Sequence, residues 1–150
     1  MRVILQPCSF RRLPKPHPIS HLVPFLSDEE RHAMSTWEAE NVVVWGKNDR
    51  QRSRWTLIET ADIALFCNRR VYFARGSVAL TTRNPTLVMK FGQEGTDGEE
   101  QRNLIIYRDI RLINIPLETV NKSIGYAPNA LLRQFTILSP SRSAAVQVLL

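Results

Sequence analysis

Residues 41–76 read NVVVWGKNDRQRSRWTLIETADIALFCNRRVYFARG, and this stretch decides how the rest of the chain is interpreted. An apolar run ends at Trp45, a polar, arginine-rich segment leads to Trp55, and two further apolar runs follow at 63–67 and 71–74. Short apolar runs that are bounded by turn residues are typical of β-strands. The stretch therefore predicts a strand, a basic loop or short helix, and two more strands joined by a turn.

The end of the first predicted strand has the composition of a binding site. Trp45 offers a flat surface for stacking, and Gly46 has no side chain, so other groups can approach it closely. The cations that follow suit phosphate groups, and they are Lys47, Arg50, Arg52 and Arg54. Large aromatic side chains are also common in cores, so Trp45 and Trp55 could equally pack beneath a solvated basic loop.

Length and composition predict one globular domain over residues 1–150. A hydrophobic fraction of 43% is sufficient for a real core, and a charged fraction of 23% does not indicate disorder. The apolar ending at 148–150 suits either a domain cut from a longer protein or a packed C-terminal helix. No apolar run approaches the roughly 18 residues of a membrane-spanning helix, so we expect a cytoplasmic protein with no membrane partner.

The two cysteines and the histidines give no indication of a metal or a cofactor. Cys8 and Cys67 are far apart and lie in no metal or redox spacing, which favours small buried hydrophobic residues. His17 and His21 lie in a proline-rich segment and cannot share a helical face. We therefore expect no metal site and no cofactor.

The positive charge is concentrated in the central part of the chain. The net charge is +6, and residues 41–91 hold nine cations and three anions, so the whole excess lies there. Arginine outnumbers lysine sixteen to four, a bias that suits bidentate contacts to phosphate. A polyanion is the natural partner, although a solvated face of the protein would show the same pattern. The candidate phosphate-binding residues are Arg50, Arg52, Arg54, Arg69, Arg70 and Arg75.

The N-terminal part predicts a strand, an extended segment and a short helix. Residues 2–6 have the pattern of a strand, and the five prolines of residues 7–24 exclude a helix there. Ser27 and Glu30 form a capping box, which predicts a helix from this point to about Trp37.

The later part predicts further strands and then helices. The expected strands are 75–80, 87–91, 103–107 and 110–115, with an acidic glycine-rich loop at 92–100. The expected helices begin at Leu117, near Ala130 and at Ser139, and the first of them ends at Gly125. This order predicts an α+β fold with a curved or barrel-like mixed sheet of about six strands, flanked by short helices.

Several short motifs occur together in one order. They are VVVWG (42–46), a basic stretch to Trp55, ADIALF (61–66), VYFARGSV (71–78), FG (91–92), NLIIYRDIRLINIP (103–116) and IGY-P (124–128). In this order they resemble the PUA-like superfamily. More narrowly, the chain resembles the EVE and EVE-like reader domains of modification-dependent restriction systems, with YTH domains as more distant relatives. The resemblance covers about residues 41–138.

The resemblance implies a domain that receives a flipped-out base and holds it between aromatic side chains. The residues that it assigns to base binding are Trp45, Gly46, Lys47, Asn48, Trp55 and Phe91. The chain departs from the family pattern at Ala61-Asp62, where members commonly have GD, and at Phe91, where they commonly have tryptophan. Either Phe91 or Trp55 would be the second wall of the pocket.

The expected function is therefore recognition of a methylated base in DNA. The free-energy cost of flipping the base out of its strand would be nearly balanced by the free energy gained when the base stacks on an aromatic ring. The sequence holds no GxSxG, Walker or zinc motif, so we expect no catalytic residues and no enzymatic activity. A nuclease or motor would lie on another domain or subunit, in cis or in trans. The alternatives are an RNA-binding PUA-like or YTH-like module and a structural or interaction domain.

Overall fold

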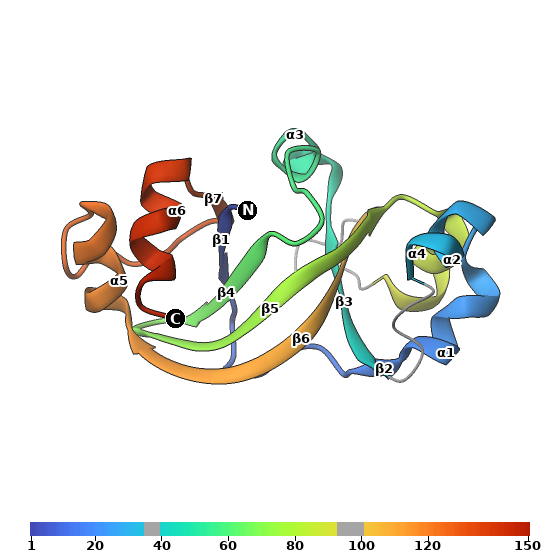
Figure 1. The fold of residues 1–150 in the computed structure, drawn as a ribbon, viewed down its shortest axis with the longest axis horizontal. Helices are drawn as coiled ribbons and strands as arrows, with labels where there is room; N and C mark the ends of the chain where they lie inside the picture. The colour runs from blue at the N-terminus through green and yellow to red at the C-terminus, as the bar shows by residue number, and fades with distance from the viewer. Residues whose placement is uncertain (35–39, 93–100) are drawn as a thin grey trace. The chain divides into compact units, whose positions relative to one another are not determined.

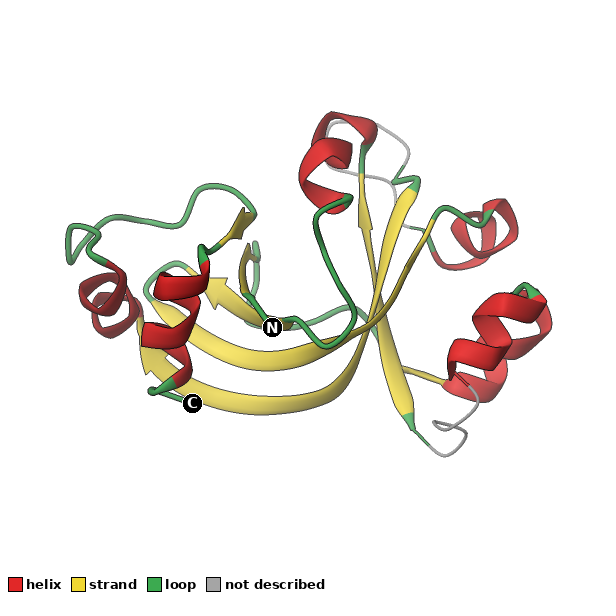
Figure 2. Ribbon diagram, turned by 45° about the horizontal axis from the view of Figure 1, so that its top comes forward, coloured by secondary structure: helices red, strands yellow, loops and turns green. Residues whose placement is uncertain are grey.

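A computed structural model describes residues 1–34, 40–92 and 101–150 (Figures 1 and 2). Its strands are β1 (Val3–Pro7), β2 (His17–Pro18), β3 (Asn41–Lys47), β4 (Ile63–Asn68), β5 (Val71–Thr82), β6 (Asn103–Pro116) and β7 (Thr136–Ile137). Its α-helices are α1 (Ile19–Leu22), α2 (Asp28–Met34), α3 (Arg52–Trp55), α4 (Pro85–Phe91), α5 (Leu117–Ile124) and α6 (Pro140–Gln147). Two 3-10 helices are η1 (Val23–Phe25) and η3 (Asp49–Gln51).

The described strands form one mixed sheet in the order β2-β3-β6-β5-β4-β1-β7. β1 pairs with β4 in parallel, whereas β3 with β6 and β4 with β5 are antiparallel. The order has two ends, so the described strands form an open sheet and not a closed barrel. The prediction of an α+β fold with a mixed sheet and short flanking helices is confirmed, with seven strands in place of about six.

The chain divides into two compact units, which we call the terminal unit and the tryptophan unit. The terminal unit comprises Met1–Leu13, Ala61–Ser77 and Asp109–Leu150, and the tryptophan unit comprises Pro14–Thr60 and Val78–Arg108. β5 and β6 each contribute residues to both units. The expectation of a single domain over residues 1–150 stays a prediction.

One β6 strand replaces the two strands expected at 103–107 and 110–115. The predicted break coincides with Asp109, which has a φ of 52° and is the residue at which β6 enters the terminal unit. An aspartate tolerates this left-handed backbone better than most residues do. The local turn signal was therefore real, but the strand continues through it.

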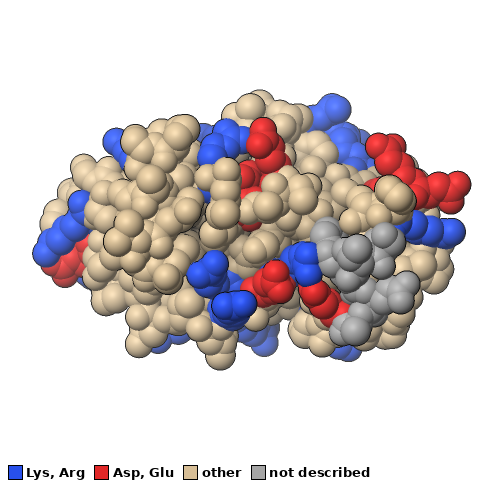
Figure 3. Space-filling view, in the orientation of Figure 1, with Lys and Arg blue, Asp and Glu red and all other residues tan. Residues whose placement is uncertain are grey.

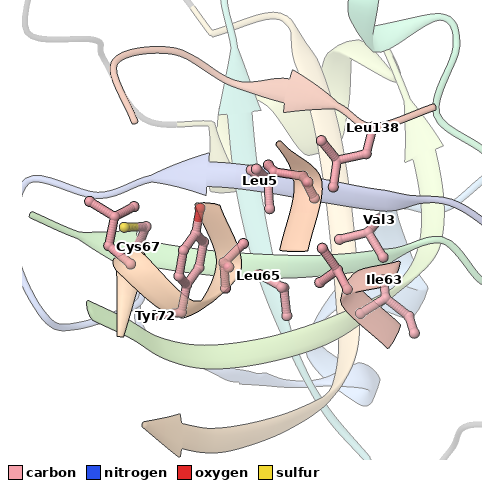
Figure 4. Close-up of a cluster of buried hydrophobic side chains, with 11 residues drawn as sticks. Val3, Leu5, Ile63, Leu65, Cys67, Tyr72 and Leu138 are labelled. Carbon is pink, nitrogen blue, oxygen red and sulfur yellow. The ribbon is translucent and has the colours of Figure 1, made fainter. Parts of the chain in front are cut away.

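The core of the terminal unit is built from alternate residues of neighbouring strands (Figure 4). Val3 and Leu5 of β1 lie in register with Ile63 and Leu65 of β4, so their side chains share one face of the sheet. α5 and α6 contribute further apolar side chains to the same cluster. Burial raises the pKa of the Cys67 thiol in this core to about 11, as expected of a buried, unreactive cysteine.

The core of the tryptophan unit lies on one face of the β3–β6 pair. Val42 and Val44 of β3 and Leu104 and Ile106 of β6 supply the strand side chains. The helical side chains packed into the same cluster are Ile19, Leu22, Met34 and Leu87. Helices α1, α2 and α4 lie together in both ribbon views.

The capping box at the start of α2 is confirmed. The Ser27 amide donates to Glu30 Oε1 at 2.9 Å, and the Glu30 amide donates to Ser27 Oγ at 3.2 Å. Burial alone would raise the pKa of Glu30, but hydrogen bonds from Ser27, Thr82 and Asn84 outweigh burial and lower it. Trp37 and the acidic segment 93–100 lie outside the described residues.

Three local predictions are wrong. Residues 7–24 do contain a helix, because α1 forms in the proline-free interval after Pro18. Residues 87–91 are helical, since the Asn84 side chain accepts from the amides of Thr86 and Leu87 and Pro85 occupies the first helical position. Residues 130–134 form no helix.

Hydrogen bonds from Asn121 account for the loop that is found in place of the helix predicted near Ala130. The buried Asn121 side chain donates from Nδ2 to the carbonyls of Ala127, Pro128 and Ala130 at 3.2, 3.1 and 2.8 Å. These bonds take up the carbonyl groups that a helix would use. The helices predicted at Leu117 and Ser139 are confirmed, with Gly125 at φ 79° ending α5.

Candidate nucleic-acid interface

Trp45 lies on β3 with its side chain opposite the core of the tryptophan unit. Because side chains alternate along a strand, Val42 and Val44 enter that core whereas Trp45 points to the other face. Trp45 pairs with Ile105 of β6 and is half-buried. The Lys47 ammonium lies 5.8 Å from the centroid of the Trp45 ring, within cation–π range.

The space that the missing side chain of Gly46 leaves is taken by Gln101 of the same chain. A Cβ atom added at Gly46 would lie 2.4 Å from Cβ of Gln101, closer than side chains normally come. Gly46 pairs with Leu104, and Gln101 precedes this part of β6 along the chain. The missing side chain therefore lets the segment before β6 lie directly against the end of β3.

The segment from Asn48 to Trp55 leaves β3 as a tight basic turn. The Asn48 side chain accepts a hydrogen bond from the Arg50 amide at 3.1 Å and caps η3, which α3 follows. The exposed arginines of this segment are Arg50, Arg52 and Arg54. The Asn48 side chain thus has a structural role as the N-cap of η3, which the sequence did not predict.

Trp55 ends this segment and is fixed to β6. Its indole Nε1 donates to the Leu104 carbonyl at 3.1 Å, and the side chain is half-buried. Indole has a single hydrogen-bond donor, so this bond fixes the orientation of the ring. The tryptophan unit therefore holds Trp45, Trp55 and three exposed arginines within one short stretch of chain.

A polar cluster that the sequence did not single out lies at the start of this turn. Asp49 is within 3.5 Å of Arg83 and 3.9 Å of Arg102, and it accepts a hydrogen bond from Asn103 Nδ2 at 3.0 Å. Acidic and basic side chains also lie next to one another on the face in Figure 3. No local signal marks these partners, because 34 to 54 residues separate them from Asp49 in the sequence.

Phe91 belongs to a different aromatic group. It ends α4, with its ring centroid 5.0 Å from that of His17 and 6.1 Å from that of Phe25, in edge-on geometry. It packs against the core cluster that contains Val44, on the face of β3 opposite Trp45. The structure therefore brings Phe91 together with His17 and Phe25, whereas Trp55 ends the basic segment that follows Trp45 along the chain.

The six candidate phosphate-binding arginines fall into two groups. Arg50, Arg52 and Arg54 belong to the tryptophan unit, whereas Arg69, Arg70 and Arg75 belong to the terminal unit. Arg69 has a φ of 55° in the turn between β4 and β5, and both Arg69 and Arg70 are exposed. Arg75 lies on β5 opposite Leu65 and is half-buried.

Within residues 1–34, 40–92 and 101–150, no three acidic, histidine or cysteine side chains gather as metal ligands would. None of the helices in the same residues has the length and apolar character needed to cross a bilayer.

Two solved structures share this arrangement of elements over almost their whole length. The N-terminal domain of Thermococcus gammatolerans McrB bound to m5C DNA has a TM-score of 0.65 at 13% identity, covering 99% of this chain and 96% of that chain. This chain therefore has an α+β, PUA-like fold. Human THYN1 protein, in complex with DNA that contains 5-methylcytosine, has a TM-score of 0.50 at 12% identity, covering 99% and 97% of the two chains.

The shared fold confirms the PUA-like fold that the motifs indicate. No protein-family model matches the sequence, and no curated protein matches it. At these identities the likeness concerns the fold, and the roles of Trp45, Trp55 and the arginines rest on their geometry.

Proposed function

We propose that this EVE-like domain is a DNA reader that prefers a strand carrying a methylated base, with 5-methylcytosine as the first candidate. The observation that carries the proposal is the half-buried Trp45, which stands at the end of β3 beside Gly46 and within the same unit as Trp55 and three exposed arginines. Both similar folds were solved with DNA that contains methylated cytosine, which supports DNA as the partner.

In this proposal the base leaves the duplex and stacks on Trp45. Flipping costs a few kcal/mol, and stacking on an aromatic side chain returns about 1–3 kcal/mol per base. A buried methyl group adds about 1 kcal/mol, which corresponds to about a fivefold difference in affinity. The methyl can therefore decide a nearly balanced equilibrium, provided that the ring is held in place and water is excluded.

Lys47 and Trp55 complete the proposed base site. The Lys47 ammonium close to the Trp45 ring strengthens the electrostatic character of that surface, and the oriented Trp55 ring is the second aromatic wall. Phe91 keeps a packing role, because its ring contacts His17 and Phe25 on the other face of β3.

The arginines of the Asn48–Trp55 segment would bind the DNA backbone without reading sequence. The domain itself would carry no activity, and it would act as the specificity module of a modification-dependent restriction system whose nuclease or motor lies on another domain or subunit. Arg69, Arg70 and Arg75 would add contacts from the terminal unit.

The test is a titration of matched duplexes that carry 5-methylcytosine, 5-hydroxymethylcytosine, 6-methyladenine or no modification, with the wild type and Trp45→Ala. We expect the wild type to prefer one modified duplex by about fivefold, and Trp45→Ala to bind all four alike. Trp45→Phe keeps a smaller stacking surface and should give an intermediate ratio. Equal affinity of the folded wild type for all four duplexes would contradict the reader function, and tighter binding of a matched RNA would favour the RNA module.

A further inference from the structure

The side-chain amide of Asn103 joins the end of β3 to the start of the basic turn. Asn103 is fully buried, and its Nδ2 donates to the Lys47 carbonyl and to Asp49 Oδ1, both at 3.0 Å. Both hydrogen bonds come from the amide nitrogen, whereas the amide oxygen Oδ1 has no hydrogen-bond partner among the described residues. One group therefore fixes two points of the chain that flank Asn48.

The same start of β6 also fixes the other end of the turn. The Leu104 carbonyl accepts from Trp55 Nε1 at 3.1 Å, and Ile105 lies opposite Trp45 in the β3–β6 register. Three consecutive residues of β6 thus contact the beginning of the basic segment, its end and the strand that carries Trp45. The segment between Asn48 and Trp55 is held at both ends by β6.

The Asp49 carboxylate interacts with two arginines as well as with Asn103. Arg83 and Arg102 approach its two carboxylate oxygens at 3.5 and 3.9 Å, in addition to the bond from Asn103. Asp49 is exposed, so solvent screens these ion pairs and the hydrogen bond from the buried Asn103 is the contact with the more defined geometry. The first residue of η3 is therefore located by the buried amide.

We propose that Asn103 is the positioning residue of the base site: by holding Asp49 against Lys47, it fixes the spacing between the Trp45 ring and the Asn48–Trp55 segment. This inference rests on the proposed function. A single methyl group is discriminated only by a site with a fixed geometry, whereas exposed arginines reach phosphates from many conformations. Loosening the turn should consequently remove the methyl preference before it removes salt-dependent binding.

Two variants separate the hydrogen bond from the charge of Asp49. Asp49→Asn and Asp49→Ala both remove the negative charge, but only the asparagine keeps an oxygen that can accept from Asn103. We expect Asp49→Asn to keep the methyl preference and Asp49→Ala to lose it, because their charges are equal and only the acceptor differs. The comparison of Asp49→Asn with Asp49→Ala tests the proposal even if Asn103→Ala does not fold.

The matched control for Asn103→Ala is Asn121→Ala in the terminal unit. Asn121 is also buried and also donates from Nδ2 to backbone carbonyls, so its loss should cost comparable stability. It belongs to the other unit, and its hydrogen bonds go to backbone carbonyls of that same unit. We expect Asn121→Ala to keep the wild-type methyl preference.

The experiment measures the affinity ratio for methylated and unmethylated duplexes over a range of salt concentrations, with urea denaturation confirming that each full-length variant is folded. We expect Asn103→Ala to reduce the ratio from about fivefold to about one while the slope of log K against log salt stays unchanged. A folded Asn103→Ala protein with the wild-type ratio would overturn the proposal, as would an equal loss in Asn121→Ala.

A second measurement, which needs no DNA, tests the positioning role of Asn103 independently of the proposed function. In a protein whose only tryptophan is Trp55, acrylamide quenching reports how well the turn protects that ring. Asn103→Ala should increase the quenching of Trp55, and Asn121→Ala should not. If the wild type shows no methyl preference at all, the reader function fails, and unchanged quenching in Asn103→Ala would overturn the positioning role independently.

Discussion

At the scale of single residues, the proposed site depends on the absence of a side chain at Gly46. An added Cβ would meet Gln101 Cβ at 2.4 Å and Gln101 Cγ at 3.2 Å, so the segment before β6 would have to move. The same segment leads into Asn103 and Leu104, which hold the basic turn. We therefore expect a substitution at Gly46 to alter the position of Trp45 and, through Leu104, that of Trp55.

We predict that Gly46→Ala lowers the free energy of unfolding by about 1–3 kcal/mol, the usual cost of overpacking. Urea denaturation of the variant measures this loss. Gln101→Gly removes the atoms that the new methyl group would meet, so the double variant should recover part of the stability in a double-mutant cycle. Additive losses in the cycle would show that the contact between the two positions is not the cause.

At the scale of elements, short helices are fixed by their ends more than by their length. α2 spans Asp28–Met34, too few residues to be stable by itself, and its capping box satisfies backbone donors of its first turn. Asn84 serves both this region and α4, since its Nδ2 donates to Glu30 Oε1 at 2.8 Å while its Oδ1 caps α4.

We predict that Ser27→Ala costs about 0.5–2 kcal/mol of stability, because the Glu30 amide loses its acceptor. Thermal or urea denaturation measures the cost. The affinity of the folded variant for DNA should not change, since α2 and its cap lie in the group of helices that packs on the core face of β3. A loss of affinity without a loss of stability would place α2 in the binding surface.

At the scale of the whole molecule, the excess positive charge is divided between the two units. Arg50, Arg52 and Arg54 share a unit with Trp45, whereas Arg69, Arg70 and Arg75 do not. Part of the remaining charge is locally neutralised, because Arg83 and Arg102 are paired with Asp49 and Arg108 is paired with Glu40.

We predict that replacing Arg50, Arg52 and Arg54 together with alanine weakens binding to every duplex and reduces the slope of log K against log salt by up to about 3. The methyl preference should persist, because phosphate contacts carry no base information. The matched variant replaces Arg69, Arg70 and Arg75, which removes the same charge from the terminal unit, and it should reduce the slope less because these arginines only add to the contacts of the Asn48–Trp55 segment. An equal change of slope in both triple variants would assign the DNA backbone to both units.

The features that depend on a few neighbouring residues could be predicted from the sequence alone. β1, β3 and β4 follow from their apolar runs, the start of α2 from its capping box, and the end of α5 from the left-handed Gly125. These features are local because the groups that satisfy one another lie three or four residues apart. The ordered motifs were also sufficient to indicate the PUA-like fold.

Which of these features come together in space depends on how the strands pair. The registers of β3 and β6 place Trp45 on one face and Val44 on the other, which separates Trp45 from Phe91. Asn103 reaches Lys47 and Asp49 across 56 and 54 residues of sequence, and no short-range pattern encodes that distance. A strand pairing is set by the burial of whole faces, so the partners of a buried polar side chain follow from the assembled sheet and not from its own segment.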